Sequence, residues 1–270
     1  IGGPAEVMAF PQNPQELAHI LKVTKELDIT CAILGAGTNI LAPDEGCRGL
    51  VICLKDCLGG MELLPGNCIR VMAGVTMARA AVFAANHGLS GLEFAHGIPG
   101  TVGGGVYMNA GAYGGEMSGI CRSVTLMDGA GQLREVNARE LEFSYRHSKL
   151  QESGEIVISA ALQLQPAAPE EVKQKMRELQ AKRLASQPLD YPSAGSAFKR
   201  PAGGYAAALI DQAGLRGFQV GQAAIARKHA GFAINLGGAT AAEMRKLLTQ
   251  VSDRVFRQTG IRLEPEIRIW

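Results

Sequence analysis

The sequence has no strong excess of charge of one sign, no long hydrophobic run and no targeting signal. Its 27 basic and 25 acidic residues give a formal net charge of +2, with both signs mixed along the chain. A charge this small gives no reason to expect a nucleic-acid or membrane-surface partner. No apolar run approaches the ~20 residues that cross a bilayer. The first residues, IGGPAEV, lack both the features of a signal peptide and an initiator Met, so we expect an upstream segment to be missing.

Paired metal-ligand spacing is also missing. The six cysteines lie in the first half of the chain and none forms a C-x-x-C pair, so no zinc or other metal site is predicted. Cys31 and Cys53 fall in apolar, strand-like runs, and we expect buried, reduced thiols as in a cytosolic protein. The five histidines are scattered, and no pattern gives any of them a catalytic role.

Length and composition predict a folded chain of two domains. The chain has 270 residues, of which 47% are hydrophobic and 19% charged. Strand and helix patterns mix without strict β-α-β alternation, which predicts an α+β architecture. The sequence has a Pro-rich, linker-like stretch at 166–171 and a Pro- and Gly-rich stretch at 187–204. These predict that the second domain covers 187–270. The first domain then covers 1–186, with lobes of about 1–62 and 63–186, and the last strand is able to pack back on it.

Periodicity and turn residues predict the main elements. Helices are expected over 13–27, 76–86, 170–183 and 240–260, and strands over 31–34, 49–55, 68–74, 155–165 and 261–270, with a hairpin over 124–136. Capping boxes are expected at Asn13 with Glu16 and at Thr240 with Glu243. The first helix should bury Leu17, Ile20, Leu21 and Leu27, and the last should bury Met244, Leu247, Leu248, Val251 and Val255 before it ends at Gly260.

Two glycine-rich loops follow apolar strands. The first, in CAILGAGTNIL, resembles half of a dinucleotide fingerprint, but Ile40 replaces its third glycine and a strand is expected next, so a Rossmann site is excluded. Closely spaced glycines can still form an anion-binding nest, to which Thr38 and Asn39 would add donors. A tight turn between strands is the equally weighted alternative.

The second loop, EFAHGIPGTVGGGVYMNAGAYGG at 93–115, has eight glycines in 23 positions. Gly103, Gly104 and Gly105 disfavour both helix and strand, and Pro99 fixes one backbone angle among them. Such a segment stays rigid only if something large packs against it. Together the two loops suggest one extended ligand with a charged middle, such as a diphosphate-bridged dinucleotide, whereas a loop-rich connection between strands is the structural alternative.

Five segments occur in the order found in one enzyme family. GAGTNIL, GLEFAHGIPGTVGGGVYMNAGAYG, YRHS, SAGSAFKRP and LEPEIR resemble the UDP-N-acetylenolpyruvoylglucosamine reductases over essentially the whole chain. The sequence is similar to the shorter type, which lacks the inserted tyrosine loop, so no lid tyrosine is assigned. The resemblance implies a two-lobed FAD-binding domain of the vanillyl-alcohol-oxidase type and a smaller α+β substrate-binding domain.

The resemblance also implies a reaction in the cytoplasm. NADPH would give a hydride to FAD, and reduced FAD would pass it to the enolpyruvyl group of a UDP-sugar, forming UDP-N-acetylmuramate for peptidoglycan. The FAD contacts carried over from the family are Gly35, Gly37, Thr38, Asn39, Ile40, Gly97, Ile98, Pro99, Gly100, Thr101, Gly103, Gly104, Asn109, Gly111, Ala112 and Tyr113.

Three residues match the catalytic positions of the family. Ser196 would donate a proton, Arg146 would clamp a carboxylate at two points, and Glu266 would donate to the enolate. Each of the three also has a structural interpretation. Ser196 could be a turn serine, and Arg146 a basic residue near a helix C-terminus. Glu266 could be an exposed strand carboxylate that pairs with Arg268 and shares a face with Glu264. The S-x-x-K pattern that begins at Ser196 is rejected as an acyl-enzyme motif, because S-D-N and K-T-G are absent.

Cations are also expected, because the implied substrate carries a diphosphate and a carboxylate. The candidates are Lys199, Arg200, Arg216 and Lys228, each of which could instead be a solvated surface residue. Two alternatives stay open: a flavin oxidase of the same fold, or a flavin-binding module without turnover. The sequence does not determine the oligomeric state, for which we expect a monomer.

Overall fold

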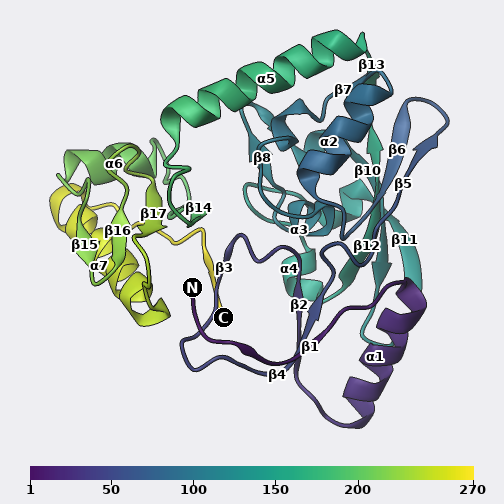
Figure 1. Cartoon of the computed structure of the whole chain (residues 1–270), viewed down its shortest axis with the longest axis horizontal. Coiled ribbons are helices and arrows are strands. Elements are labelled where there is room, and N and C mark those ends of the chain that lie inside the picture. Colours follow the sequence, from purple (N-terminus) through teal and green to yellow (C-terminus); the bar gives the residue numbers. More distant parts are fainter. The chain divides into compact units, whose positions relative to one another are not determined.

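The computed structural model describes all 270 residues, which form two compact units (Figure 1). The large unit contains Val7–Gly37 and Gly49–Ala181. The small unit contains Ile1–Glu6, Thr38–Arg48 and Lys182–Trp270. Two N-terminal segments therefore belong to the same unit as the C-terminal third of the chain, and the sequence-based division at residue 186 stays a prediction.

The large unit is built on a five-stranded antiparallel sheet of order β11-β10-β12-β6-β5. Its central strand β12 is buried at seven of its eight positions, since both faces of the sheet are covered. The strands are β5 (Met61–Leu64), β6 (Cys68–Met72), β10 (Cys121–Met127), β11 (Leu133–Asn137) and β12 (Ile156–Gln163). The predicted hairpin over 124–136 and the strand over 155–165 are confirmed.

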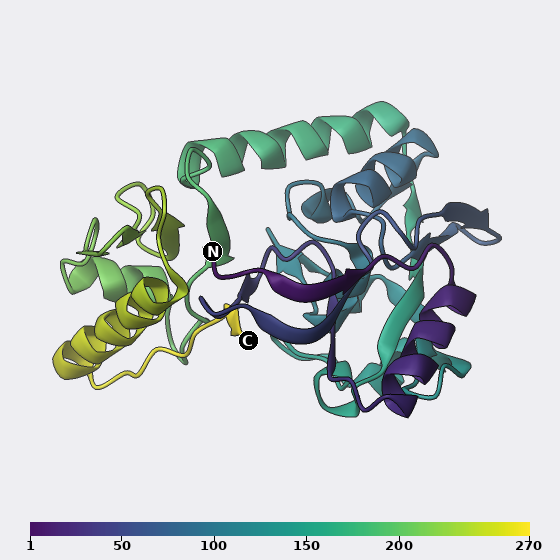
Figure 2. The same ribbon diagram turned by 60° about the horizontal axis from the view of Figure 1, so that its bottom comes forward.

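Helices lie on both faces of this sheet (Figures 1 and 2). One core joins Val157 and Leu162 of β12 to α2 (Met77–Asn86) and α3 (Val102–Tyr107). A second core joins Ile156 and Ile158 to α1 (Pro14–Glu26). Residues 156 to 158 thus alternate between two cores, as the two-residue period of a strand requires, and the register irregularity between Val157 and Ser159 lets Leu162 join the same core as Val157.

The N-terminus of α1 differs from the predicted capping box. Asn13 is the N-cap, and its Oδ1 accepts from the Glu16 backbone N–H at 2.8 Å. The Glu16 carboxylate accepts instead from the backbone N–H of Gln12, also at 2.8 Å. The expected reciprocal bond, from the backbone N–H of Asn13 itself, was therefore wrong by one residue.

The apolar face of α1 is buried in part. Leu17 and Leu21 are buried and Ile20 is half-buried, but Leu27 follows the last helical residue and is 64% exposed, so its predicted burial was also wrong.

A three-stranded sheet of order β1-β4-β2 precedes the main sheet in the chain. Strand β2 (Cys31–Leu34) runs parallel to β4 (Cys47–Cys53), and the third strand is β1 (Ala5–Ala9). Cys53 is buried as expected, but Cys31 is exposed because β2 is covered only in part. The expectation that both thiols are buried was therefore wrong for Cys31.

The small unit has a four-stranded sheet of order β14-β17-β16-β15. Its elements are β14 (Ser193–Ser196), β15 (Gln219–Val220), β16 (Ala223–Ile225), β17 (Phe232–Asn235), α6 (Ala206–Gln212) and α7 (Ala241–Thr259). The capping box of Thr240 and Glu243 is present, and Gly260 ends α7 in the left-handed conformation. The predicted apolar stripe of α7 is buried in full.

The closing strand is much shorter than predicted. Only Arg268–Ile269 forms a strand, β18, which pairs in parallel with β3 (Ile40–Leu41). Pro265 lacks a backbone N–H and makes only an isolated bridge to Phe198, so regular pairing cannot extend over 261–270.

The remaining elements are short, apart from one helix. Helix α5 (Pro169–Ser186) covers the predicted 170–183. The others are β7 (Leu89–Ser90) with β13 (Gln165–Pro166), β8 (Gly111–Ala112) with β9 (Gly115–Glu116), α4 (Leu150–Ser153), and three single-turn helices at Glu93–Ala95, Met117–Gly119 and Ala138–Leu141.

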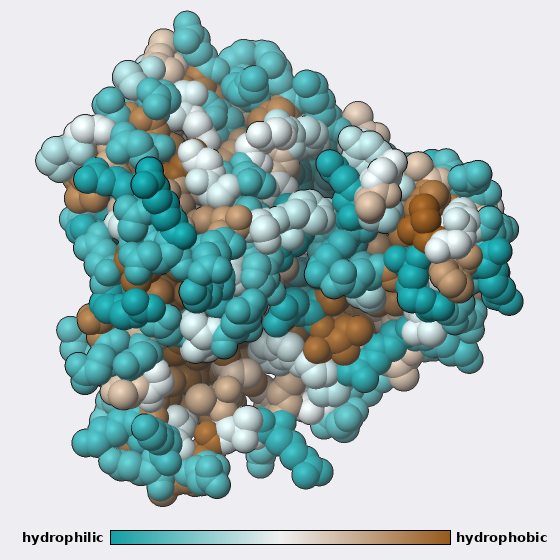
Figure 3. Space-filling view, turned by 180° about the vertical axis from the view of Figure 1, so that it is seen from behind, coloured by the Kyte–Doolittle hydropathy of each residue, from teal (hydrophilic) through white to brown (hydrophobic).

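Surface polarity follows the composition. Hydrophilic residues cover much of the face in Figure 3, and hydrophobic residues form separate patches among them. None of the helices has both the length and the apolar character that a bilayer-crossing segment needs.

Candidate active site

The two glycine-rich loops meet within the large unit at Gly35 and Thr101. A Cβ atom on Gly35 would lie 2.6 Å from Thr101 Oγ1, closer than real Cβ atoms approach a neighbour. Thr101 is itself only 2% exposed. Gly35 therefore permits a close backbone approach that any side chain would prevent.

The three consecutive glycines of the second loop form a helix, contrary to expectation. They lie in α3, where Thr101 is the N-cap and its Oγ1 accepts from the Gly104 N–H at 3.3 Å. A Cβ on Gly103 would lie 2.8 Å from Ala73 Cβ, and one on Gly105 would lie 2.8 Å from Met77 Sδ. Close packing against Ala73, which follows β6, and against Met77 of α2 thus offsets the low helix propensity of glycine.

One buried polar atom in this region bears on whether a ligand fits. His96 directly precedes Gly97, Ile98, Pro99 and Gly100, all predicted FAD contacts, and its Nδ1 is buried without a hydrogen-bond partner. Leaving such an atom unsatisfied costs roughly 1–3 kcal/mol. A bound nucleotide with phosphate or hydroxyl oxygens would supply the partner, so the loop fits the group that the sequence implies.

Arg146 lies in a tight turn rather than beside a helix C-terminus, so the dipole interpretation was wrong. The backbones of Ser144 and His147 bond each other reciprocally at 3.1 Å, and Arg146 between them has a φ of 56°. Its Nη2 donates to the Gly111 carbonyl at 3.2 Å, and its Cζ lies 5.1 Å from the centre of the Tyr145 ring. A non-glycine residue in the left-handed region is uncommon, and such residues cluster at functional sites.

Asn109 connects the second glycine loop to this turn. Its Nδ2 donates to the Ser144 carbonyl at 2.9 Å, and its Oδ1 accepts from the Ser118 N–H at 2.9 Å. The side chain is 1% exposed, with bonds to the protein at both ends of its amide. Gly111 and Ala112 follow in β8, where the Gly111 carbonyl accepts from Arg146 Nη2, and Tyr113 is 45% exposed.

Backbone pairing within the small unit places Glu266 next to Ala197, the residue that follows Ser196. The Glu266 N–H donates to the Ala197 carbonyl at 2.9 Å, and the Lys199 N–H donates to the Glu264 carbonyl at 2.8 Å. Segments 197–199 and 264–266 are therefore antiparallel neighbours. Ser196 is the last residue of β14 rather than a turn serine, and both it and Glu266 are half-buried.

The first glycine loop supplies a third group to this cluster. Asn39 Nδ2 donates to the Glu266 carbonyl at 3.2 Å, and the Asn39 carbonyl accepts from the Arg268 N–H at 2.9 Å. The Asp44 carboxylate accepts from the N–H groups of Ala241 and Ala242 at 2.6 and 2.8 Å, and these bonds lower its pKa. Because Asp44 caps α7, the segment that carries Thr38, Asn39 and Ile40 is held at both ends.

Glu264 and Glu266 have different surroundings, although the sequence predicted a shared strand face. Glu264 is exposed and forms an ion pair with Lys199 at 2.5 Å. Glu266 is half-buried, and its Oε2 atom is inaccessible to solvent. The exposed-carboxylate interpretation was therefore wrong for Glu266.

The four predicted substrate cations all belong to the small unit and differ in how they are held. Arg200 lies over the Tyr205 ring at 4.5 Å, and Lys228 Nζ donates to the Leu184 carbonyl at 2.6 Å. Arg216 binds both Asp211 oxygens, at 2.5 and 2.8 Å, and Asp211 raises its pKa. Arg216 therefore has a clear structural role, and the substrate contacts of all four, including Lys199, stay predictions.

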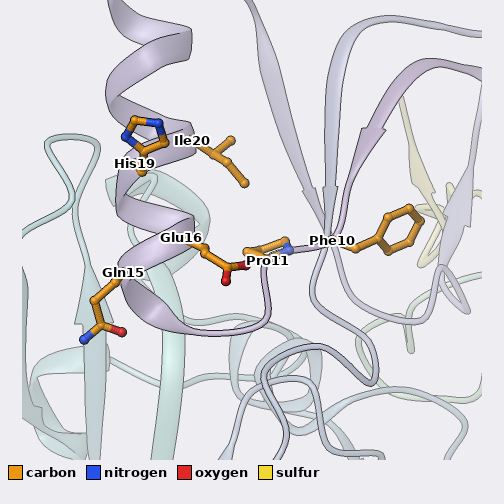
Figure 4. Close-up of a pocket in the computed structure, with 6 residues that line it drawn as sticks. All are labelled: Phe10, Pro11, Gln15, Glu16, His19 and Ile20. Carbon is orange, nitrogen blue, oxygen red and sulfur yellow. The ribbon is translucent and has the colours of Figure 1, made fainter.

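A surface pocket lies elsewhere in the large unit. It is formed by the start of α1 and the residues that precede it (Figure 4). The lining residues are Phe10, Pro11, Gln15, Glu16, His19 and Ile20. None of them is a predicted site residue, so this pocket is separate from the glycine loops.

Sequence and structure comparisons agree with this geometry. Residues 5–137 match the family model of an FAD binding domain, which makes the chain a flavin-binding protein of α+β architecture. Residues 187–270 match the model described as the C-terminal domain of UDP-N-acetylenolpyruvoylglucosamine reductase. The predicted fold class is confirmed by this combination.

Full-length relatives define the family. The chain is 45% identical to the UDP-N-acetylenolpyruvoylglucosamine reductase of Agathobacter rectalis over 100% of this chain and 89% of the relative. It is 46% identical to that of Lactobacillus acidophilus over 99% and 89%. The crystal structure of the Thermus caldophilus enzyme matches with a TM-score of 0.81 and 36% identity, covering 100% of this chain and 94% of that one. The chain belongs to the UDP-N-acetylenolpyruvoylglucosamine reductase family, and the resemblance seen in its motifs is confirmed.

Two features of the site had no signal in the sequence. The His96 side chain was one of five scattered histidines, and only its burial beside the second glycine loop draws attention to it. The contact between Asn39 and the Glu266 carbonyl joins residues 227 positions apart. No spacing rule could have predicted that contact.

Proposed function

We propose that this chain is an FAD-containing enzyme that uses NADPH to reduce the enolpyruvyl group of UDP-N-acetylglucosamine enolpyruvate. The product is UDP-N-acetylmuramate, a peptidoglycan precursor. The pairing of segments 197–199 and 264–266 carries the proposal, because it makes Glu266 the backbone neighbour of Ala197, which directly follows Ser196, and Asn39 of the first glycine loop bonds the Glu266 carbonyl. Membership of the family supports the same conclusion.

FAD, when bound, supplies the hydride-transfer chemistry that protein side chains lack. Ser196 donates a proton to the carbon next to the substrate carboxylate. A serine hydroxyl is a weak acid, so it serves only where that carbon is strongly basic and water is excluded. Its half-buried place at the end of β14, next to fully buried Ala197, fits this requirement.

Two further groups stabilise negative charge on the substrate. Arg146 clamps the substrate carboxylate with two parallel N–H donors and stays charged throughout. Glu266 is proposed to donate a hydrogen bond to the enolate oxygen. Lys199, Arg200, Arg216 and Lys228 are proposed to contact the carboxylate or diphosphate, and Arg216 is the candidate most engaged within the protein.

Some finer features belong to the same proposal. We infer an FAD-binding domain over 1–186 and a substrate-binding domain over 187–270, with NADPH as the reductant and the cytoplasm as the place of reaction. We expect no nucleic-acid or membrane partner, since the net charge is only +2. A monomer is expected, and sedimentation of the purified protein tests that expectation.

The colour of the purified protein tests the proposed function. The protein should be yellow, lose its colour with NADPH under anaerobic conditions, and regain it on addition of enolpyruvyl-UDP-GlcNAc. Recovery by oxygen alone would favour a flavin oxidase. Colour that NADPH never bleaches would favour a binding module without turnover, and either result would contradict the reductase.

Gly35→Ala should weaken FAD binding while the protein stays folded. The added methyl group would lie 2.6 Å from the buried Thr101 hydroxyl, so the two glycine loops must move apart. We expect the FAD dissociation constant to rise roughly tenfold or more, since about 1.4 kcal/mol of strain is a factor of ten. Quenching of flavin fluorescence on titration measures this constant.

Gly59→Ala is the matched control for the loop variant. A Cβ at Gly59 meets nothing within 4 Å, so this substitution adds the same methyl group without a clash. Its FAD affinity should equal that of the wild type. Equal affinities in all three proteins would show that the contact between Gly35 and Thr101 does not shape the cofactor site.

A further inference from the structure

The left-handed turn at Arg146 is held by a residue that no motif singled out. Gln151 is in α4, which lies next to α3 in the large unit (Figure 1). Its Nε2 donates to the Arg146 carbonyl at 3.1 Å and to the Tyr107 carbonyl at 3.1 Å. The same nitrogen lies 3.8 Å from Met108 Sδ. One amide therefore joins the end of α3 to the backbone of Arg146.

The conformation of Arg146 requires such a restraint. Its φ of 56° is disfavoured for a residue with a Cβ, and an isolated turn would relax toward negative φ. Rotation about φ moves the carbonyl group of the same residue. A donor fixed on that carbonyl therefore resists the rotation.

The turn is restrained on both sides of Arg146. Asn109 holds the Ser144 carbonyl before it, and Gln151 holds the Arg146 carbonyl itself. With the backbone fixed, the guanidinium reaches the Gly111 carbonyl. Loss of the Gln151 bond leaves the peptide that follows Arg146 held only by the bond from the His147 N–H to the Ser144 carbonyl, and the direction of the Arg146 side chain is then less well defined.

We propose that Gln151 is a positioning residue for Arg146, whose carbonyl it holds so that the guanidinium is preset for the substrate carboxylate. The inference rests on the proposed function, in which Arg146 binds that carboxylate. We propose no contact of Gln151 itself with substrate or cofactor. Its contribution is to the geometry of the arginine, and a small misplacement of such a group can cost about 100-fold in rate.

A purely structural role makes a different prediction. Gln151 also anchors the Tyr107 carbonyl, and the fully buried Ser148 hydroxyl bonds the same carbonyl at 2.7 Å. Ser148→Ala removes an anchor of α3 without removing the bond to the Arg146 carbonyl. This variant is therefore the matched control for a general loosening of this region.

The test uses the FAD-loaded, full-length protein and follows the two half-reactions separately by stopped flow. Gln151→Met keeps the length of the side chain but removes its donors, and Gln151→Glu replaces them with an acceptor that faces two carbonyl oxygens. Both should slow reoxidation by enolpyruvyl-UDP-GlcNAc roughly 10–100-fold, by comparison with the loss of groups that orient metal ligands and with the cost of misplacing a reacting group. Flavin reduction by NADPH should change less than about twofold, which also shows that the variants are folded.

A double-mutant cycle separates positioning from structure. In an Arg146→Lys background, Gln151→Met should cause no further loss in the second half-reaction, because the group that it positions is already gone. An equal loss in both backgrounds, or the same loss in Ser148→Ala, would overturn the inference. If Arg146→Lys is impaired but both Gln151 variants react like the wild type, the inference fails alone. If wild-type protein does not react with the substrate, the proposed function fails.

Discussion

Ser196→Ala should abolish most of the second half-reaction and leave the first nearly intact. The hydroxyl is proposed to protonate the substrate carbon after hydride transfer, and it has no part in flavin reduction by NADPH. Loss of a general acid costs roughly 10²–10⁴-fold. Stopped-flow absorbance of the flavin measures both steps: bleaching by NADPH, then recovery with enolpyruvyl-UDP-GlcNAc.

Ser193→Ala is the control on the same strand. Ser193 Oγ donates to the Ala233 carbonyl at 2.8 Å, so its removal tests the structural contribution of a β14 serine. We expect a lower melting temperature for this variant but two functional half-reactions. An equal slowing of both half-reactions in Ser196→Ala would refute the proton-donor role and point to a disturbed fold.

Arg146→Lys should also lose turnover, although the positive charge is kept. Lysine has one ammonium group in place of a planar fork, so it cannot bind a carboxylate with two parallel bonds. The backbone cost of the left-handed φ is unchanged, because both residues carry a Cβ. We expect the second half-reaction to slow about 100-fold or more, with little change in flavin reduction.

Arg139→Lys is the control for exchanging an arginine in the same region. Arg139 is exposed in the single-turn helix that precedes the Arg146 turn, and no catalytic role is proposed for it. Its kinetics should match those of the wild type. Retained turnover in Arg146→Lys would show that a point charge suffices, and the two-point clamp would be discarded.

Local sequence patterns were reliable where the physics is local. The capping box of Thr240 and Glu243, the buried stripe of α7 and the hairpin over 124–136 all depend on residues a few positions apart. Such features are encoded by side-chain period and by turn chemistry. The same rules placed the end of α7 at Gly260, where a left-handed residue is needed.

Predictions failed at the ends of elements and where close packing decided the outcome. The triple glycine forms a helix because Ala73 and Met77 approach it too closely for any side chain. Leu27 is exposed because α1 ends at Glu26, and the closing strand shrinks to two residues because Pro265 interrupts its pairing. Propensity describes the isolated segment, whereas packing describes its surroundings.

The sequence by itself determined the α+β class, most element positions, the family and the identity of the candidate residues, because these are properties of residue type and spacing. The tertiary structure alone decided which of those residues are neighbours. Ala197, which follows Ser196, pairs with Glu266 through the backbones of distant segments, and Gln151 reaches the carbonyl of Tyr107, 44 residues away. Contacts of this kind depend on the whole folded chain, since the hydrogen bonds that create them join groups far apart along it.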